Sequence, residues 1–269
     1  MSSAARLVVA GLRARPRRIA YGPHRSQRCE LWIPHGAAPA DDHRVCVLVH
    51  GGSWQAKFGK WTMWAVAADL VSRGWAVWNV EYRRTGTPAD AGGWPATFAD
   101  AALGLDRLAD VMAPIDLDRV VVVGHSAGGQ LALWLAGPRN DGPAGPSRVR
   151  LRAAVSQAGV NAMADAWEAG GPVEAVIGGT PTSVPERYRA IDPVMQVPLT
   201  VPVLLVHGSD DDTVLLARSE AFAYAARAAG DDVELVVPAG KGGTHRAHVN
   251  VDSDAWAVVP PWLDARVPR

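Results

Sequence analysis

Short apolar runs alternate along the chain with longer segments in which apolar residues recur every three or four positions. The longer segments have the period of an amphipathic α-helix and cover 62–71, 98–111, 127–136 and 215–229. The apolar runs have the length of buried strands and cover 45–50, 76–80, 120–124, 153–156, 203–207 and 233–237. Strands that alternate with helices predict an α/β fold with a mostly parallel central sheet and helices on both faces.

Two segments depart from this alternation. Residues 18–33 contain two short extended runs around Tyr21-Gly22-Pro23, which predict an antiparallel hairpin at one edge of the sheet. Residues 160–198 are interrupted by glycine and proline, so no long helix can form there. An excursion of this length inside a domain usually serves a function, so we expect a small cap segment over the carboxyl edge of the sheet. A meandering surface loop is the alternative.

Length and charge favour one domain that acts on a small molecule. With 269 residues and 48% hydrophobic content, the chain can form a single core. We expect this domain over 18–269, preceded by a flexible N-terminus over 1–17. The 27 basic side chains balance the 27 acidic ones, so no net charge favours nucleic acid or an anionic membrane as a partner. The sequence does not indicate an oligomeric state.

The apolar runs, the N-terminal arginines and the two cysteines bear on the location of the protein and on its cofactors. No apolar run approaches the roughly 18 residues that a membrane span needs. The residues before Glu30 are rich in arginine, as in targeting peptides, but a secretory signal would need a longer apolar stretch. We therefore expect a cytoplasmic protein. Cys29 and Cys46 lie in apolar runs without metal-ligand spacing, so we expect buried, reduced thiols and no metal or other cofactor.

A candidate nucleophile lies between a predicted strand and a predicted helix. Residues 124–128, Gly-His-Ser-Ala-Gly, have the pattern G-x-S-x-G in the strand-turn-helix context that this turn requires. Such a turn is tight enough to need small residues two positions before and after the serine, and Gly124 and Gly128 meet that need. Ser126 would then lie at a helix N-terminus, where partial positive charge favours a developing oxyanion.

Residues 50–54, His-Gly-Gly-Ser-Trp, end an earlier strand and predict an oxyanion loop. Glycines let backbone N–H groups approach a substrate oxygen, so we expect donors from Gly51 and Gly52 together with the N–H of Ala127. Which amide of the loop points inward stays open. We expect the side chain of His50 to brace the loop rather than act as a base.

A serine hydroxyl needs a histidine to accept its proton and an acid to orient that histidine. The residues Asp210, Asp211 and Asp212 follow the strand 203–207, where such an acid would lie. Downstream of them the chain offers two histidines, His245 and His248. Spacing alone leaves both choices open.

These segments together resemble the α/β-hydrolases of the esterase, lipase and arylformamidase group, from about Arg18 to the C-terminus. Residues 50–55, His-Gly-Gly-Ser-Trp-Gln, are similar to the HGGYWQ loop of kynurenine formamidases, and 79–83, Asn-Val-Glu-Tyr-Arg, are similar to a strand end of HGG esterases. Ser53 stands where the esterases have a third glycine and the formamidases a tyrosine, so neither subfamily is singled out.

The resemblance implies the α/β-hydrolase fold and completes a catalytic triad of Ser126, Asp211 and His245. The family pattern H-G-x-x-D-x-x-V matches 207–214 and selects Asp211 as the acid. The family's loop histidine precedes a Ser-x-Ala-Trp helix start, here 253–256, and this selects His245 as the base. We expect His248 at the surface or the pocket rim, and Glu81 and Arg83 as a buried pair.

The sequence therefore predicts a serine hydrolase that cleaves a small carboxylic ester through an acyl-enzyme. An arylformamidase that cleaves N-formylkynurenine or a similar aryl formamide is the alternative. A catalytically silent protein that binds a ligand in the same pocket is the least favoured reading, because no member of the predicted triad is missing. Three tryptophans near the predicted active edge, Trp54, Trp94 and Trp167, are candidates for substrate contact.

Overall fold

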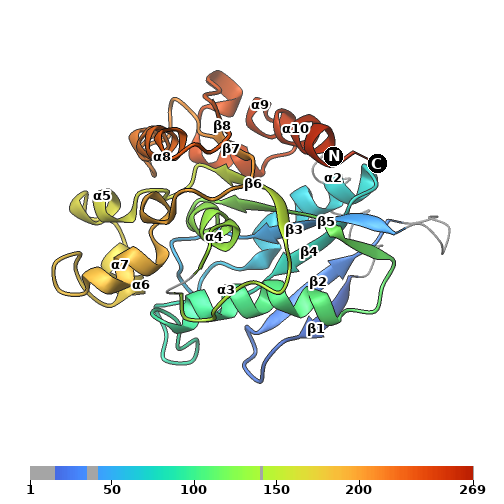
Figure 1. Ribbon diagram of the computed structural model, residues 1–269, viewed down its shortest axis with the longest axis horizontal. Helices are drawn as coiled ribbons and strands as arrows, with labels where there is room; N and C mark the ends of the chain where they lie inside the picture. The colour runs from blue at the N-terminus through green and yellow to red at the C-terminus, as the bar shows by residue number, and fades with distance from the viewer. Residues whose placement is uncertain (1–15, 35–41, 140–141, 269) are drawn as a thin grey trace.

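A central β-sheet organises the computed structural model, which describes residues 16–34, 42–139 and 142–268 (Figure 1). Within those residues the sheet has eight strands in the order β1-β2-β4-β3-β5-β6-β7-β8. The strands are β1 (Arg17–Ala20), β2 (Arg28–Trp32), β3 (His43–Val49), β4 (Ala76–Val80), β5 (Ile115–His125), β6 (Leu151–Gln157), β7 (Val203–Val206) and β8 (Val233–Val236). Residues 1–15 of the predicted flexible N-terminus lie outside the described residues, and Arg17 belongs to β1.

The sheet has one antiparallel edge and is otherwise parallel. From β4 through β3 to β8, every pair of neighbouring strands is parallel. β1 pairs with β2, and β2 with β4, in antiparallel register. The hairpin predicted over 18–33 is thereby confirmed. Parallel neighbours require crossovers, and the helices between successive strands provide them.

Each face of the sheet has its own apolar core because side chains alternate along a strand. On one face Val45, Val47 and Val49 of β3 pack with the helices α3 (Ala96–Asp106), α4 (Ala127–Ala136) and α8 (Ala217–Ala228). On the other face Cys46 and Leu48 pack with α2 (Trp64–Ser72), α9 (Asp254–Ala257) and α10 (Val259–Arg266). The predicted helices on both faces are confirmed.

Residues 160–198 form short helices rather than a meandering loop. These are α5 (Met163–Glu168), α6 (Val173–Ile177), α7 (Pro185–Ile191) and the 3₁₀ helix η3 (Pro193–Gln196), and Figure 1 shows α5, α6 and α7 grouped together beyond α4. Asp192 Oδ2 accepts hydrogen bonds from the N–H groups of Met163 and Ala164 at 3.0 and 3.1 Å, so the end of the segment is fixed to its beginning. Its role as a cap stays a prediction.

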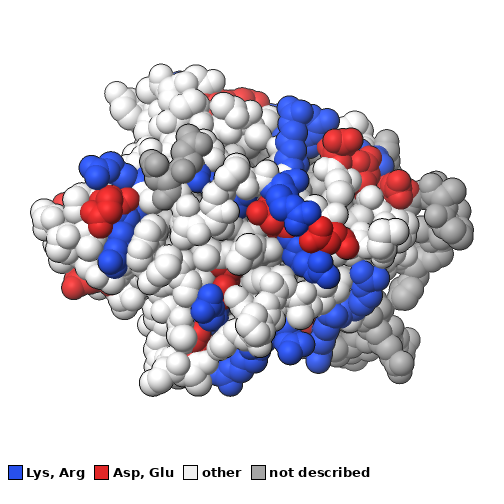
Figure 2. Space-filling model, turned by 60° about the horizontal axis from the view of Figure 1, so that its bottom comes forward, with Lys and Arg blue, Asp and Glu red and all other residues white. Residues whose placement is uncertain are grey.

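Buried thiols and mixed surface charge agree with the composition. Cys29 and Cys46 are free and have no exposed surface. On the face drawn in Figure 2, basic and acidic side chains are interspersed rather than gathered into one large patch of a single sign. None of the described helices is long and apolar enough to cross a membrane.

Candidate functional site

The turn between β5 and α4 carries Ser126. Its backbone has φ 55° and ψ −122°, a left-handed conformation that costs a non-glycine residue on the order of 1–3 kcal/mol. Two hydrogen bonds hold the backbone there: Ser126 N donates to the carbonyl of Gln157 at 2.8 Å, and Ser126 O accepts from Gly129 N at 2.9 Å. The strained strand-turn-helix geometry predicted from G-x-S-x-G is therefore present.

The flanking glycines are required by close approach of backbone. A Cβ on Gly124 would lie 1.9 Å from the carbonyl oxygen of Gly128, and a Cβ on Gly128 would lie 2.1 Å from that of Val49 in β3. Real Cβ atoms do not approach so closely, so side chains at either position would push α4 away from the sheet. The glycines thus let α4 begin directly over the strand ends.

Asp211 and His245 are brought together from the loops that follow the neighbouring parallel strands β7 and β8. Asp211 follows β7, and His245 begins the 3₁₀ helix η5 (His245–Val249). His245 Nδ1 lies 2.8 Å from Asp211 Oδ2, while Asp211 Oδ1 accepts from the N–H groups of Thr213 and Val214 at 2.9 Å each. By contrast, Asp210 and Asp212 are exposed. Of the three neighbouring carboxylates, Asp211 is the one that contacts a histidine expected in the site.

Asp211 is held as a carboxylate. Burial acts to raise its pKa, but hydrogen bonds from the His207 and His245 rings and from the N–H of Val214 outweigh burial and hold the pKa well below its usual range. His207 Nε2 lies 3.4 Å from Asp211 Oδ2. An ionised partner at Nδ1 keeps a proton on that nitrogen of His245 and leaves Nε2 as the acceptor.

Two histidines fix the backbone of His245. Its carbonyl oxygen lies 3.0 Å from His125 Nε2 and 3.2 Å from His248 Nδ1, and the rings of His125 and His245 are 4.7 Å apart between centroids. Because His125 immediately precedes Ser126, these contacts anchor η5 to the turn that carries Ser126. Among the described residues, Ser126 Oγ makes no hydrogen bond to His245, so the site pairs His245 with Asp211 and leaves Ser126 unpaired.

His248 is buried, so the expectation that it lies at the surface or the pocket rim is wrong. Burial lowers its pKa to about 4 and, acting together with the neighbouring His245 and His248, lowers the pKa of His125 to about 3. Both rings are therefore neutral near pH 7. The contact of His125 with His245 could not be found from sequence spacing, because the two residues are 120 positions apart.

The candidate oxyanion loop packs against the nucleophile turn. A Cβ on Gly51 would lie 2.9 Å from Ser126 Cβ, and Gly52 has φ +112°, where glycine is favoured. Ala127 is fully buried at the first position of α4. Among the described residues, the N–H groups of Gly52 and Ala127 have no hydrogen-bond acceptor, so both are free to bind a substrate oxygen.

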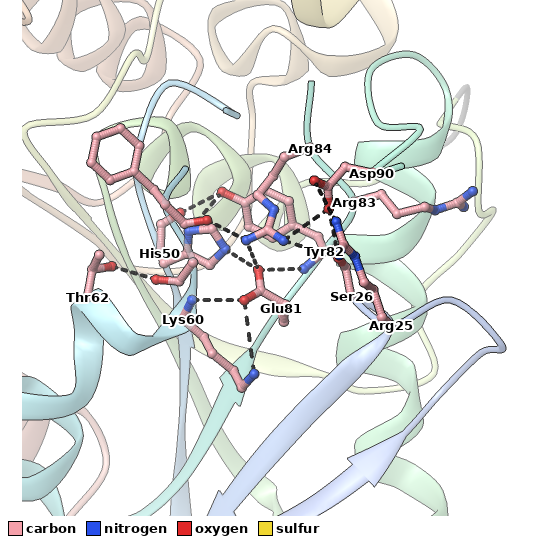
Figure 3. Close-up of polar contacts among 12 residues, drawn as sticks. Arg25, Ser26, His50, Lys60, Thr62, Glu81, Tyr82, Arg83, Arg84 and Asp90 are labelled. Atoms are coloured by element: carbon pink, nitrogen blue, oxygen red, sulfur yellow. Dashed lines mark hydrogen bonds and ion pairs between the residues drawn. The ribbon is translucent and has the colours of Figure 1, made fainter. Parts of the chain in front are cut away.

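His50 braces this loop through a buried polar cluster (Figure 3). Its Nε2 lies 2.7 Å from Glu81 Oε1, and its Nδ1 lies 2.7 Å from the carbonyl oxygen of Gly51. The pair expected between Glu81 and Arg83 is wrong. Arg83 binds Asp100 at 2.8 Å, whereas Glu81 binds His50 and Arg84.

The three candidate substrate-binding tryptophans differ in exposure. Trp54 has no exposed surface, while Trp94 and Trp167 are partly exposed. Trp94 packs near Phe98 with centroids 5.9 Å apart, and Trp167 Nε1 donates to Glu174 at 3.0 Å. The structure leaves their contact with substrate a prediction.

Arg218 at the start of α8 is a further residue that the sequence did not single out. It is 8% exposed, and burial lowers its pKa, although the carboxylates of Asp165 and Asp211 act in the opposite direction. Its guanidinium therefore contributes positive charge near Asp165 and Asp211.

Comparison with known proteins identifies the family. Residues 30–225 match the family model described as BD-FAE. The chain belongs to the BD-FAE family. Together with the sheet order and the turn at Ser126, this confirms the α/β-hydrolase fold.

Relatives of this BD-FAE member include named esterases. The chain is 27% identical over 225 residues to "Esterase LipQ" of Mycobacterium tuberculosis (strain ATCC 25618 / H37Rv). The aligned region covers 79% of this chain and 52% of LipQ. It therefore spans about half the length of that curated relative.

Solved structures share the fold at lower identity. A truncated carbohydrate esterase from gut microbiota matches with a TM-score of 0.79 and 21% identity, covering 94% of this chain and 95% of the other. Esterase 2 of Thermogutta terrifontis, phosphonylated by sarin, matches with a TM-score of 0.72 and 19% identity, covering 93% and 92%. These likenesses support the architecture of the BD-FAE member.

The close approach at Gly128 predicts a stability effect. Gly128→Ala should lower the free energy of unfolding by about 1–3 kcal/mol or more, because the new Cβ meets the backbone of Val49. Gly137→Ala, at the other end of α4, is the control. Its Cβ would lie 3.1 Å from the movable Leu199 Cδ2, so we expect a change below about 1 kcal/mol. Urea unfolding of both variants measures the contrast, and equal effects would refute the steric explanation.

The neutral histidines predict a loss of stability in mild acid. An unfolded histidine has a pKa of about 6.5, whereas His248 in the fold has a pKa of about 4. Below pH 6.5 the unfolded chain therefore binds more protons, and stability falls as pH is lowered, by at most about 1.4 kcal/mol per pH unit for each such histidine. His248→Asn keeps a donor near the Nδ1 position and cannot titrate, so unfolding free energies measured from pH 5 to 7.5 should depend less on pH. An unchanged slope would contradict this account.

Proposed function

We propose that this protein is a serine carboxylesterase that cleaves small esters through an acyl-enzyme on Ser126. The observation that carries the proposal is the 2.8 Å contact between His245 Nδ1 and Asp211, anchored through His125 to the strained turn of Ser126. A serine held out of ordinary backbone geometry beside an oriented histidine is the arrangement that nucleophilic catalysis needs. The esterase names of relatives agree with this chemistry.

His245 would act first as base and then as acid. Nε2 accepts the proton of Ser126 Oγ while the oxygen attacks the ester carbonyl carbon, and the imidazolium that forms is stabilised by the Asp211 carboxylate. The tetrahedral intermediate collapses when His245 returns the proton to the leaving alcohol. Water then repeats the sequence on the acyl-enzyme and releases the acid.

The substrate carbonyl oxygen would be bound by backbone N–H groups. We assign this role to Gly51, Gly52 and Ala127, supported by the free N–H groups of the last two and by the contact of Gly51 with the turn. Each such donor is worth roughly 3 kcal/mol in the transition state. The N-terminal end of α4 adds its partial positive charge.

Substrate size and aromatic contacts belong to the same proposal. The helices of 160–198 would form a small cap, with Trp167 in α5 and Trp94 near α6, whose residue Val176 accepts a hydrogen bond from Trp94 N at 2.7 Å. Trp54 would support the pocket from within, since its ring is buried. Short acyl esters are the first substrates to try.

An aryl formamide is the second candidate, on the likeness of 50–55 to the formamidase loop. Formamide cleavage would use the same three side chains. A panel of p-nitrophenyl esters of increasing acyl length, assayed beside N-formylkynurenine, separates the two by their kcat/KM values.

Removal of the nucleophile is the first test. Ser126→Ala should abolish ester hydrolysis and covalent labelling by a fluorophosphonate while the unfolding midpoint changes little, because only the reactive oxygen is lost. Mass spectrometry of the labelled parent should place the adduct on Ser126. Parent activity should survive exhaustive EDTA treatment, because a histidine base needs no metal. A labelled Ser126→Ala variant would refute the assignment.

Substitutions of the two histidines of η5 should have very different effects on kcat. His245→Ala should lower kcat by roughly 10⁴-fold, as for removal of one member of a triad. His248→Asn, the matched control, keeps the contact with the His245 carbonyl and should cost about tenfold or less, near 1.4 kcal/mol. The reverse order of the two variants would exclude His245 as the base.

A further inference from the structure

Both ring nitrogens of His50 face oxygen atoms, and this decides where the protons lie. The carbonyl of Gly51 can only accept a hydrogen bond, so Nδ1 at 2.7 Å must donate to it. Glu81 Oε1 lies 2.7 Å from Nε2. The Glu81 carboxylate thus contacts the end of the ring opposite to the one that donates to Gly51.

The surroundings keep Glu81 ionised. Its second oxygen accepts from Lys60 N at 3.1 Å, and Arg84 Nη1 lies 2.9 Å from Oε1 (Figure 3). Burial acts to raise the pKa of Glu81, but His50 and Arg84 outweigh it and leave the pKa below its ordinary value. Lys60 Nζ, 4.0 Å from Glu81 and 3.8 Å from Glu30, balances the remaining charge.

Tyr82 fixes the orientation of the same ring. The two rings are stacked with centroids 4.3 Å apart and planes at 3°, and Tyr82 Oη donates to the His50 carbonyl at 2.7 Å. With one face covered and both nitrogens bound, the His50 ring cannot turn without breaking the pair with Glu81. The position of Nδ1 is therefore set from outside the loop.

A trans peptide points its C=O and its N–H in opposite directions. The carbonyl of Gly51 belongs to the same peptide as the N–H of Gly52, so holding that carbonyl at His50 directs the Gly52 N–H to the opposite side. Gly51 itself abuts the turn, with a Cβ position 2.9 Å from Ser126 Cβ. The Gly52 N–H has no acceptor among the described residues.

We propose that His50, held by Glu81, is a positioning residue that directs the Gly52 N–H into the oxyanion hole beside Ser126. This inference rests on the proposed function and adds which amide of the loop binds the oxyanion and what sets its direction. If the peptide between Gly51 and Gly52 could rotate, its N–H would point away from the oxyanion hole in a fraction of the molecules. Because its carbonyl is held by His50, the N–H needs no reorientation when negative charge develops on the substrate oxygen.

Two substitutions of His50 distinguish the contact made by Nδ1 from the contact made by Nε2. An asparagine places its amide nitrogen near the position of Nδ1, and a glutamine places it near that of Nε2. His50→Asn can thus still donate to Gly51 O, whereas His50→Gln keeps the contact with Glu81 and loses the one with Gly51. Tyr82→Phe is the control for general loosening of the loop, because it removes the hydrogen bond to the His50 carbonyl at 2.7 Å and a long contact with Nδ1 at 3.5 Å, but leaves both partners of Nδ1 and Nε2 in place.

The measurement is kcat and KM for p-nitrophenyl acetate, with the unfolding midpoint of each variant. We expect His50→Gln to lower kcat by roughly 10²–10³-fold with KM nearly unchanged, the effect of losing one oxyanion donor. His50→Asn and Tyr82→Phe should stay within about tenfold of the parent. Equal losses in the two His50 variants, or a larger loss in His50→Asn, would overturn the inference while leaving an active parent and the proposed function intact.

A second measurement needs no turnover. In ¹⁵N NMR of the parent at pH 7, Nδ1 of His50 should carry hydrogen, assigned by comparison with His50→Gln. An unprotonated Nδ1 would refute the positioning role whether or not the parent hydrolyses esters. An inactive parent that fluorophosphonate does not label, but whose His50 carries hydrogen on Nδ1, would refute the esterase proposal alone.

Discussion

The backbone conformation of Ser126 is the constraint on which the rest of the site depends. At φ 55° and ψ −122° the serine is held against its own preference, and the energy comes from the packing of α4 on the ends of β3 and β5. Parallel strands end at one edge of the sheet, so loops that follow different strands meet there. The glycine loop after β3, the turn after β5 and the Asp211 loop after β7 therefore converge without further constraint.

Much of this architecture could be predicted from local patterns. The apolar run 76–80 coincides with β4, and the periodic segment 127–136 coincides with α4. In each case a glycine or a polar residue close to either end interrupts the apolar pattern where the element stops. The helices of 160–198 could not be predicted. They are short, glycine and proline interrupt their period, and the segment is closed by Asp192, which binds N–H groups 28 and 29 positions away.

The candidate site likewise has one part that could be predicted from the sequence and another that could not. The turn at Ser126 could be recognised because its requirement for small residues is local, and the choice of Asp211 and His245 needed the family resemblance. The contact of the His125 ring with the His245 carbonyl depends on two loops that are distant in the sequence and meet only in the fold. The error at Glu81 and Arg83 has a related cause: both follow the end of β4, where strand alternation no longer sets side-chain direction, so Arg83 reaches Asp100 in α3 and Arg84 folds back to Glu81.

The histidines near the turn at Ser126 differ in what their ring nitrogens contact. The neighbouring rings are committed: His125 and His248 donate to the His245 carbonyl, and His207 lies 2.8 Å from the Val214 carbonyl and 2.7 Å from Ser219 Oγ. Burial makes protonation of His125 and His248 costly. Among the histidines that the structure describes, only His245 combines partial exposure of its ring with a direct contact to the Asp211 carboxylate. In the proposed mechanism, proton transfer from the serine would go to the side chain that Asp211 can stabilise, while the neutral rings of His125 and His248 hold the backbone of His245 in place.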